Sequence, residues 1–113
     1  MRNPKWHRDE IILALDLYFN PNRGTITSTN PKIIELSEKI NKLKIPVNRN
    51  DEKKFRNPNG VSLKLSNFLA LDPKYQGAGM KSYSKLDAEL FEKYSTNLSL
   101  LQKDALKIKA EIK

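Results

Sequence analysis

Apolar side chains recur every three or four residues along much of the chain, and this spacing is typical of amphipathic helices. Asp9 and Glu10 begin the first such segment, where the helix dipole favours negative charge. Trp6 precedes it and is placed to pack on its first turn, while Pro21 and Gly24 end it. The predicted inner stripe of this helix is Ile11, Ile12, Leu15, Tyr18 and Phe19.

A second helix is predicted after Asn30, which is a good N-cap residue and is followed by Pro31 at the first helical position. Pro46 ends it, and residues 47–54 carry too little apolar material to form anything but a solvated loop. The apolar stripe of this second helix is Ile33, Leu36, Ile40 and Leu43.

A third helix is predicted from Pro58 or Asn59 to about Leu71, because Asp72 and Pro73 stop it. A wheel drawn at 100° per residue places one group of side chains toward the core: Val61, Leu65, Phe68 and Leu69. The same wheel turns a small, polar and almost uncharged set outward: Asn59, Ser62, Leu63, Ser66, Asn67 and Ala70.

The fourth predicted helix is a long one, from about residue 84 to residue 112. Ser84 caps it, with Asp87 three residues later, as in a capping box. We expect its last two turns to extend beyond the core of the domain. Its apolar stripe is Phe91, Tyr94, Leu98, Leu101, Ala105, Ile108 and Ile112.

The whole chain therefore predicts an all-α fold, a small four-helix domain spanning residues 1–113. No segment shows sustained period-two alternation, and the only strand candidate, "GTITST", is short. A length of 113 residues is ordinary for one domain with one modest core.

The charge of the chain indicates an acidic partner. Lys and Arg number 21 against 13 acidic residues, for a net charge of +8. Between residues 53 and 85 there are seven basic residues and one acid, so this part supplies +6 of the total. Nucleic acid or an anionic membrane surface would suit this charge, and a lysine-rich solubility surface is the plainer alternative.

The inventory of reactive residues argues against catalysis by this chain. It has no cysteine, which favours a reducing, cytoplasmic compartment. Its longest apolar run, residues 11–15, is too short to cross a membrane. His7 is the one histidine, so neither a metal site nor a Ser/His/Asp triad is expected, and no cofactor is expected. The glycines of "QGAGMK" lack the context of a phosphate loop and predict a turn.

The order of the helices instead predicts DNA binding. A first helix, a second helix and a third helix with a polar outer face match the helix-turn-helix and Myb-like arrangement, in which the third helix enters the major groove. The connection between the last two, residues 44–57, is much longer than the usual turn. Four residues are candidates for contacts with base edges or with nearby phosphates: Asn59, Ser62, Ser66 and Asn67. Leu63 is placed to contact the 5-methyl group of a pyrimidine. Asn57 is a further DNA-binding candidate. A set of cations is expected to contact the DNA backbone: Lys53, Lys54, Arg56, Lys64, Lys74, Lys81 and Lys85.

Four stretches carry a family resemblance: "RNPKWHRDEIILALDLYF", "PKIIELSEKINKL", "FRNPNGVSLKLSNFLALDPKYQGAGM" and "SKLDAELFEKY". They resemble the N-terminal region of HNH endonucleases of the 5-methylcytosine-specific restriction enzyme A kind, and the resemblance covers nearly the whole chain. It implies a DNA-targeting module of a restriction system that senses modified DNA. It lends no cleavage chemistry, because the HNH motif and its metal belong to a separate, downstream nuclease domain.

Two alternatives stay open. A flipped base held in an aromatic cage would recruit Tyr75 or Tyr83 in place of Leu63. A protein-interaction module would instead use the apolar stripe of the fourth helix as a dimerisation seam. The expected partners are thus double-stranded DNA, together with either an attached HNH nuclease domain or a second copy of the chain, and no membrane.

Overall fold

The computed structural model describes residues 5–43, 55–75 and 82–112, and these form α-helices joined by turns. In chain order the elements are α1 (Arg8–Tyr18), α2 (Pro31–Asn41), α3 (Pro58–Leu71), a short 3₁₀ turn η1 (Pro73–Tyr75), α4 (Lys85–Ser95) and α5 (Leu98–Ala110). No strand occurs within the described ranges. The all-α prediction is confirmed, although those ranges hold five α-helices where the sequence pattern predicted four.

Side-chain caps fix where the helices begin. Asn30 accepts a hydrogen bond from the backbone N–H of Lys32, with Pro31 following at the first helical position, as predicted. Ser84 and Asp87 form the predicted capping box of α4. His7 caps α1, since its Nδ1 accepts from a backbone N–H of the first turn. The single histidine therefore has a local structural role.

The prediction of one long helix from residue 84 to residue 112 is wrong, because the chain turns between α4 and α5. Thr96 ends α4, and Asn97 caps α5 by accepting a hydrogen bond from the backbone N–H of Leu100 at 3.2 Å. Leu98, expected on the apolar stripe, is 41% exposed. The break allows α4 and α5 to pack separately against α1.

The end of the chain also stays within the core, contrary to expectation. Leu101, Ala105 and Ile108 of α5 are buried in the same cluster as the residues of α1. Because α5 packs along α1, its last turns do not extend past the domain.

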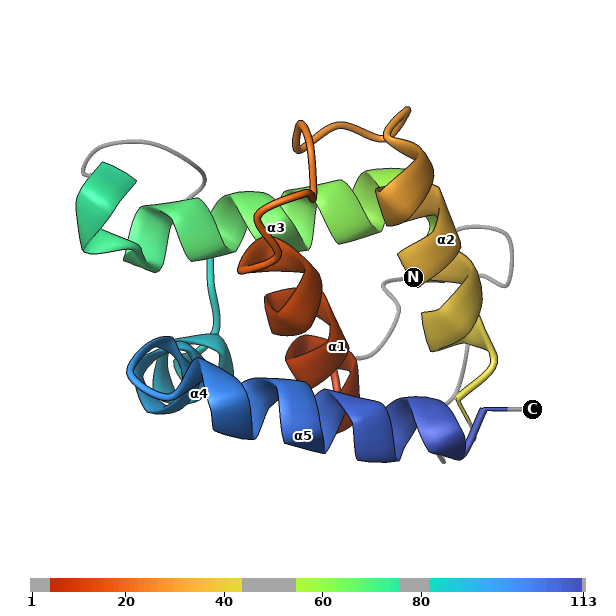
Figure 1. Ribbon diagram of the computed structural model, residues 1–113. Coiled ribbons are helices and arrows are strands. Elements are labelled where there is room, and N and C mark those ends of the chain that lie inside the picture. The colour runs from red at the N-terminus through yellow and green to blue at the C-terminus, as the bar shows by residue number, and fades with distance from the viewer. Residues whose placement is uncertain (1–4, 44–54, 76–81, 113) are drawn as a thin grey trace.

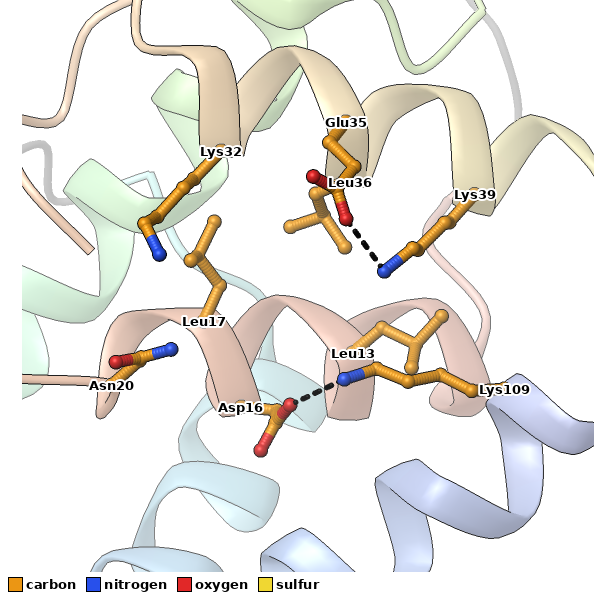
Figure 2. Close-up of a pocket in the computed structure, with 9 residues that line it drawn as sticks. All are labelled: Leu13, Asp16, Leu17, Asn20, Lys32, Glu35, Leu36, Lys39 and Lys109. Carbon is orange, nitrogen blue, oxygen red and sulfur yellow. Dashed lines mark hydrogen bonds and ion pairs between the residues drawn. The ribbon is translucent and has the colours of Figure 1, made fainter. Parts of the chain in front are cut away.

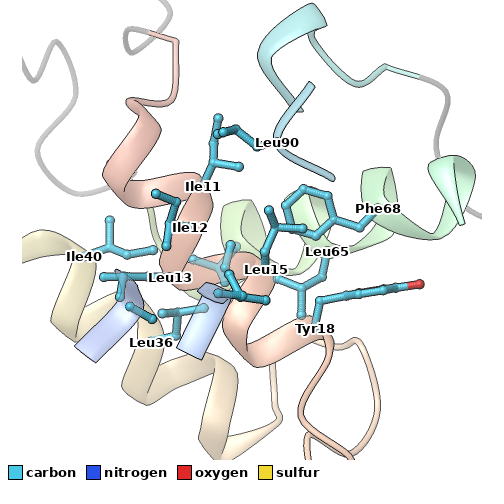
Figure 3. Packing of buried hydrophobic residues seen from close by; sticks show 14 of the residues in the cluster. Ile11, Ile12, Leu13, Leu15, Tyr18, Leu36, Ile40, Leu65, Phe68 and Leu90 are labelled. Carbon is cyan, nitrogen blue, oxygen red and sulfur yellow. The ribbon is translucent and has the colours of Figure 1, made fainter. Parts of the chain in front are cut away.

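The central element is α1, which contacts α2, α3, α4 and α5. Figure 1 shows α3 and α5 on opposite sides of it. Every residue from Glu10 to Leu15 is buried, as expected for a helix that is apolar around most of its circumference. Figure 3 shows Leu15 and Tyr18 of α1 packed beside Leu65 and Phe68 of α3.

None of the helices in the described part of the chain has the length and apolar character that a membrane span requires.

Candidate nucleic-acid interface

The local sequence sets the start and the rotation of α3. The Asn57 side chain caps the helix by accepting from the backbone N–H of Gly60 at 2.8 Å, and Pro58 occupies the first helical position. The predicted inner residues Val61, Leu65 and Phe68 have no more than traces of exposed surface. Since these residues face α1, the opposite side of α3 is the one available to a partner.

The side of α3 that faces solvent is narrower than the wheel predicted. Asn59 is exposed and Leu63 is 42% exposed, while Ser66 and Ala70 are half-buried. These four residues follow one another at spacings of four, three and four and so form one stripe. We call Asn59, Leu63, Ser66 and Ala70 the outer stripe.

Ser62 and Asn67 were predicted to face outward, and this orientation is wrong. Ser62 is 8% exposed and its hydroxyl donates to the backbone carbonyl of Asn59 at 2.8 Å. Asn67 is 7% exposed, and its Oδ1 accepts from the Ser82 hydroxyl at 3.1 Å. The wheel assumed burial on one side only, whereas α3 packs against α1, α2 and α4 and therefore buries a wider arc.

Arg56, expected to contact the DNA backbone, is buried inside the domain. Its Nε donates to Glu10 Oε2 at 2.8 Å, and its Nη2 donates to Glu10 Oε1 at 3.1 Å and to the Lys5 carbonyl at 3.2 Å. Its guanidinium carbon lies 4.9 Å from the centre of the Trp6 ring and 4.4 Å from that of Phe55. The geometry assigns Arg56 to holding the segment before α3 against α1.

The backbone at Arg56 is unusual as well. Its φ angle is +48°, a left-handed conformation that residues other than glycine rarely adopt. The Ser37 hydroxyl donates to the Arg56 carbonyl at 2.6 Å, and Asn41 Nδ2 donates to the same oxygen at 3.4 Å. Hydrogen bonds from α2 thus hold this strained residue in place.

Lys64 is also engaged within the domain. Its amine donates to Asp87 Oδ2 at 2.8 Å and lies 5.2 Å from the centre of the Trp6 ring. The Lys64 side chain is 11% exposed and that of Asp87 is fully buried. Asp87 Oδ1 is buried and has no hydrogen-bond partner among the described residues. This ion pair therefore links α3 to α4, leaving little of the lysine for an external phosphate.

The other predicted contact residues divide into two groups. Lys74 and Lys85 are exposed, as a phosphate contact requires. Lys53, Lys54 and Lys81 lie outside the described residues. Tyr75 and Tyr83, proposed for an aromatic cage, are 46% and 40% exposed.

Within the described residues, two acids from segments that adjoin α3 are buried. The helix itself contains none. Asp87 is fully buried, and Asp72, 9% exposed, accepts a hydrogen bond from the Tyr18 hydroxyl at 2.8 Å. Burial, followed by this hydrogen bond, raises the pKa of Tyr18 well above its usual value. These two carboxylates are consequently not exposed to a partner of α3.

A second basic feature, which the sequence patterns did not single out, lies between α1, α2 and α5. Figure 2 shows Lys32, Lys39 and Lys109 around a groove that is also lined by leucines. The volume of this groove is about 140 Å³. Lys109 pairs with Asp16 at 3.0 Å and Lys39 with Glu35 at 2.9 Å. The hydrogen bond from Lys39 is the main cause that lowers the pKa of Glu35. Because two of its three lysines already have acidic partners, this groove has little attraction left for an anion.

Comparisons with known proteins assign no family. No family model, curated protein or solved structure matches the chain significantly. The resemblance to HNH endonucleases accordingly stays a prediction.

Proposed function

We propose that the chain is a DNA-binding module that targets a restriction-type HNH nuclease, with α3 lying in the major groove in a helix-turn-helix-like manner. One observation carries the proposal. The outer stripe combines short polar side chains with the exposed Leu63, and two acids from segments that adjoin α3, Asp72 and Asp87, are buried with hydrogen-bond donors. The net charge of +8 supports the same conclusion.

Electrostatics explain why the burial of these acids matters. Duplex DNA carries one negative charge for about every 1.7 Å of its axis, so an exposed carboxylate on the docking face would be repelled. Among the predicted phosphate contacts that the structure describes, Lys74 and Lys85 are exposed. The contributions of Lys53, Lys54 and Lys81 stay predictions.

Base recognition is assigned to three residues of the outer stripe. Asn59 and Ser66 carry groups that hydrogen bond to base edges in the major groove. Leu63 offers an apolar contact for the C5-methyl group of thymine or of 5-methylcytosine. Ser62 and Asn67, which have hydrogen bonds within the protein, position the helix in this account.

The experiment is a mobility-shift assay on matched unmodified, 5-methylcytosine and 5-hydroxymethylcytosine duplexes across a range of salt concentrations. The logarithm of the binding constant should fall linearly with the logarithm of the salt concentration. Leu63→Ala should reduce the preference among the three duplexes, while Leu106→Ala, which truncates an exposed leucine on α5, should not. Binding that is insensitive to salt, or equal effects of the two leucine variants, would count against the proposal.

A dimerisation module built on the C-terminal helix has less support. The apolar residues that would form its seam, Leu101, Ala105 and Ile108, are buried against α1 within the same chain. Sedimentation at two protein concentrations tests this alternative, since a dimer that lacks DNA affinity would favour it.

A further inference from the structure

A cavity of about 290 Å³ lies at the C-terminal end of α3. Its walls come from two segments far apart in the sequence, one following α1 and the other following α3. The side chains that matter for its chemistry are Tyr18, Phe19, Arg23, Asp72, Lys74 and Tyr75. Its volume is at the lower limit for sites that hold small ligands. Since η1 follows α3 directly and two of its residues line the cavity, the cavity lies next to the last turn of α3.

The guanidinium of Arg23 has an unsatisfied donor here. Its Nε is buried and has no hydrogen-bond acceptor among the described residues. Its guanidinium carbon lies 4.9 Å from the centre of the Tyr18 ring, and this contact fixes the group without satisfying its N–H. Buried donors are nearly always paired, so the hydrogen bonding of this guanidinium is incomplete among the described residues, and the group lines the cavity.

The carboxylate in the cavity is already engaged. Asp72 Oδ2 accepts from the Tyr18 hydroxyl at 2.8 Å, and its Oδ1 accepts from the backbone N–H of Lys74 at 3.0 Å. The raised pKa of Tyr18 keeps its hydroxyl protonated and donating to Asp72 at neutral pH. The groups left for a ligand are therefore mainly cationic donors, the guanidinium of Arg23 and the amine of Lys74.

We propose that this cavity binds a phosphate group, with Arg23 and Lys74 as its donors. A guanidinium offers paired N–H groups that match phosphate oxygens, and the lysine adds a point charge. The rings of Phe19 and Tyr75 form apolar walls for the sugar that adjoins the phosphate. In the DNA complex the ligand is a backbone phosphate beside the footprint of α3, a step that rests on the proposed function.

The test measures duplex affinity against salt for the full chain and for Arg23→Gln, Lys74→Gln and Lys103→Gln. Each of the first two should weaken binding about tenfold on every duplex and reduce the salt slope by about one. Lys103, exposed on α5 on the other side of α1, provides the matched control and should change neither quantity by as much. Lys74 is exposed, so its variant keeps the test valid if Arg23→Gln fails to fold.

A second measurement separates the two proposals. Deoxycytidine monophosphate and inorganic phosphate are titrated into the protein while the Nε–H resonance of Arg23 is followed by NMR. Duplex binding that is unchanged in both variants would overturn the phosphate site and leave the DNA-binding proposal standing. Absence of duplex binding, with a shift of the Arg23 resonance on adding the mononucleotide, would overturn the DNA-binding proposal and support a site for free nucleotides. If the protein neither binds duplex DNA nor shows a shift of the Arg23 resonance, both proposals are wrong.

Discussion

Arg56 and Glu10 form an ion pair in which both side chains are almost completely buried, with 4% and 0% of their surfaces exposed. Two guanidinium nitrogens of Arg56 donate to the two oxygens of Glu10. Glu10 Oε1 also accepts from the backbone N–H of His7, at 2.7 Å, in the capping box of α1. One carboxylate thus joins the start of α1 to the segment that leads into α3, and so sets the position of the proposed recognition helix.

Removing one member of this pair should destabilise the fold severely. Glu10→Gln removes the negative charge that accepts two hydrogen bonds from the buried Arg56, and breaking a buried ion pair in this way costs about 3–5 kcal/mol of unfolding free energy. Urea denaturation measures it, with Glu38→Gln, at an exposed position of α2, as the control. A cost for Glu10→Gln no larger than that of the control would contradict the role assigned to the pair.

The pair can be tested further with a double-mutant cycle. Arg56→Met should also be destabilising, but the two changes together should cost less than the sum of the single changes, because no charge is then left buried. Additive costs would mean that the two residues act independently.

Replacing Lys64 should lower the stability of the fold rather than the affinity for DNA. Lys64→Gln removes the charged hydrogen bond to Asp87, and we expect a loss of about 1.5–3 kcal/mol in unfolding free energy. Lys103→Gln, at an exposed site, should stay within about 0.5 kcal/mol of the parent protein. Thermal and urea unfolding measure both. An unchanged stability with weakened DNA binding would instead support the sequence-based assignment of Lys64 to a phosphate contact.

The buried hydroxyl of Tyr18 should make stability fall at alkaline pH. Burial and the hydrogen bond to Asp72 raise the pKa of Tyr18 in the folded protein, so its contribution is fully present below the unfolded value of about 10. Above that pH the unfolded chain loses the proton first, and stability falls by up to about 1.4 kcal/mol per pH unit. Urea unfolding from pH 8 to 11 should therefore show a steeper decline for the parent than for Tyr18→Phe, which has no proton to lose at this position. Parallel pH profiles would refute this account.

Local features of the sequence predicted where α2, α3 and α4 begin. The pairs Asn30 with Pro31 and Ser84 with Asp87 act within one helical turn, so the residues concerned are visible in a short window of sequence. The burial of Leu65 and Phe68 followed from their spacing on α3 in the same way. These features depend on neighbours along the chain, and a pattern can therefore reveal them.

The residues of the candidate site were predicted less well, because their exposure depends on contacts between residues that are distant in the sequence. Arg56 and Glu10 are 46 positions apart, and Lys64 and Asp87 are 23 apart. Nothing in a basic run shows that two of its cations have buried acidic partners on other helices. Arg23 was missed for a related reason, since the cavity beside it forms only when η1 packs near the end of α1.

The turn between α4 and α5 can be tested by the sign of the change in unfolding free energy when Asn97 is replaced. Asn97 caps α5 by accepting from the backbone N–H of Leu100, so Asn97→Ala should lower the unfolding free energy by about 0.5–2 kcal/mol. In an uninterrupted helix through this position, the same change would raise stability, because alanine has the higher helix propensity. Gln102→Ala, at an exposed position inside α5, is the matched control and should be neutral or slightly stabilising. Urea denaturation of the three proteins decides between the two geometries, and a stabilised Asn97→Ala variant would mean that the break between α4 and α5 is absent in solution.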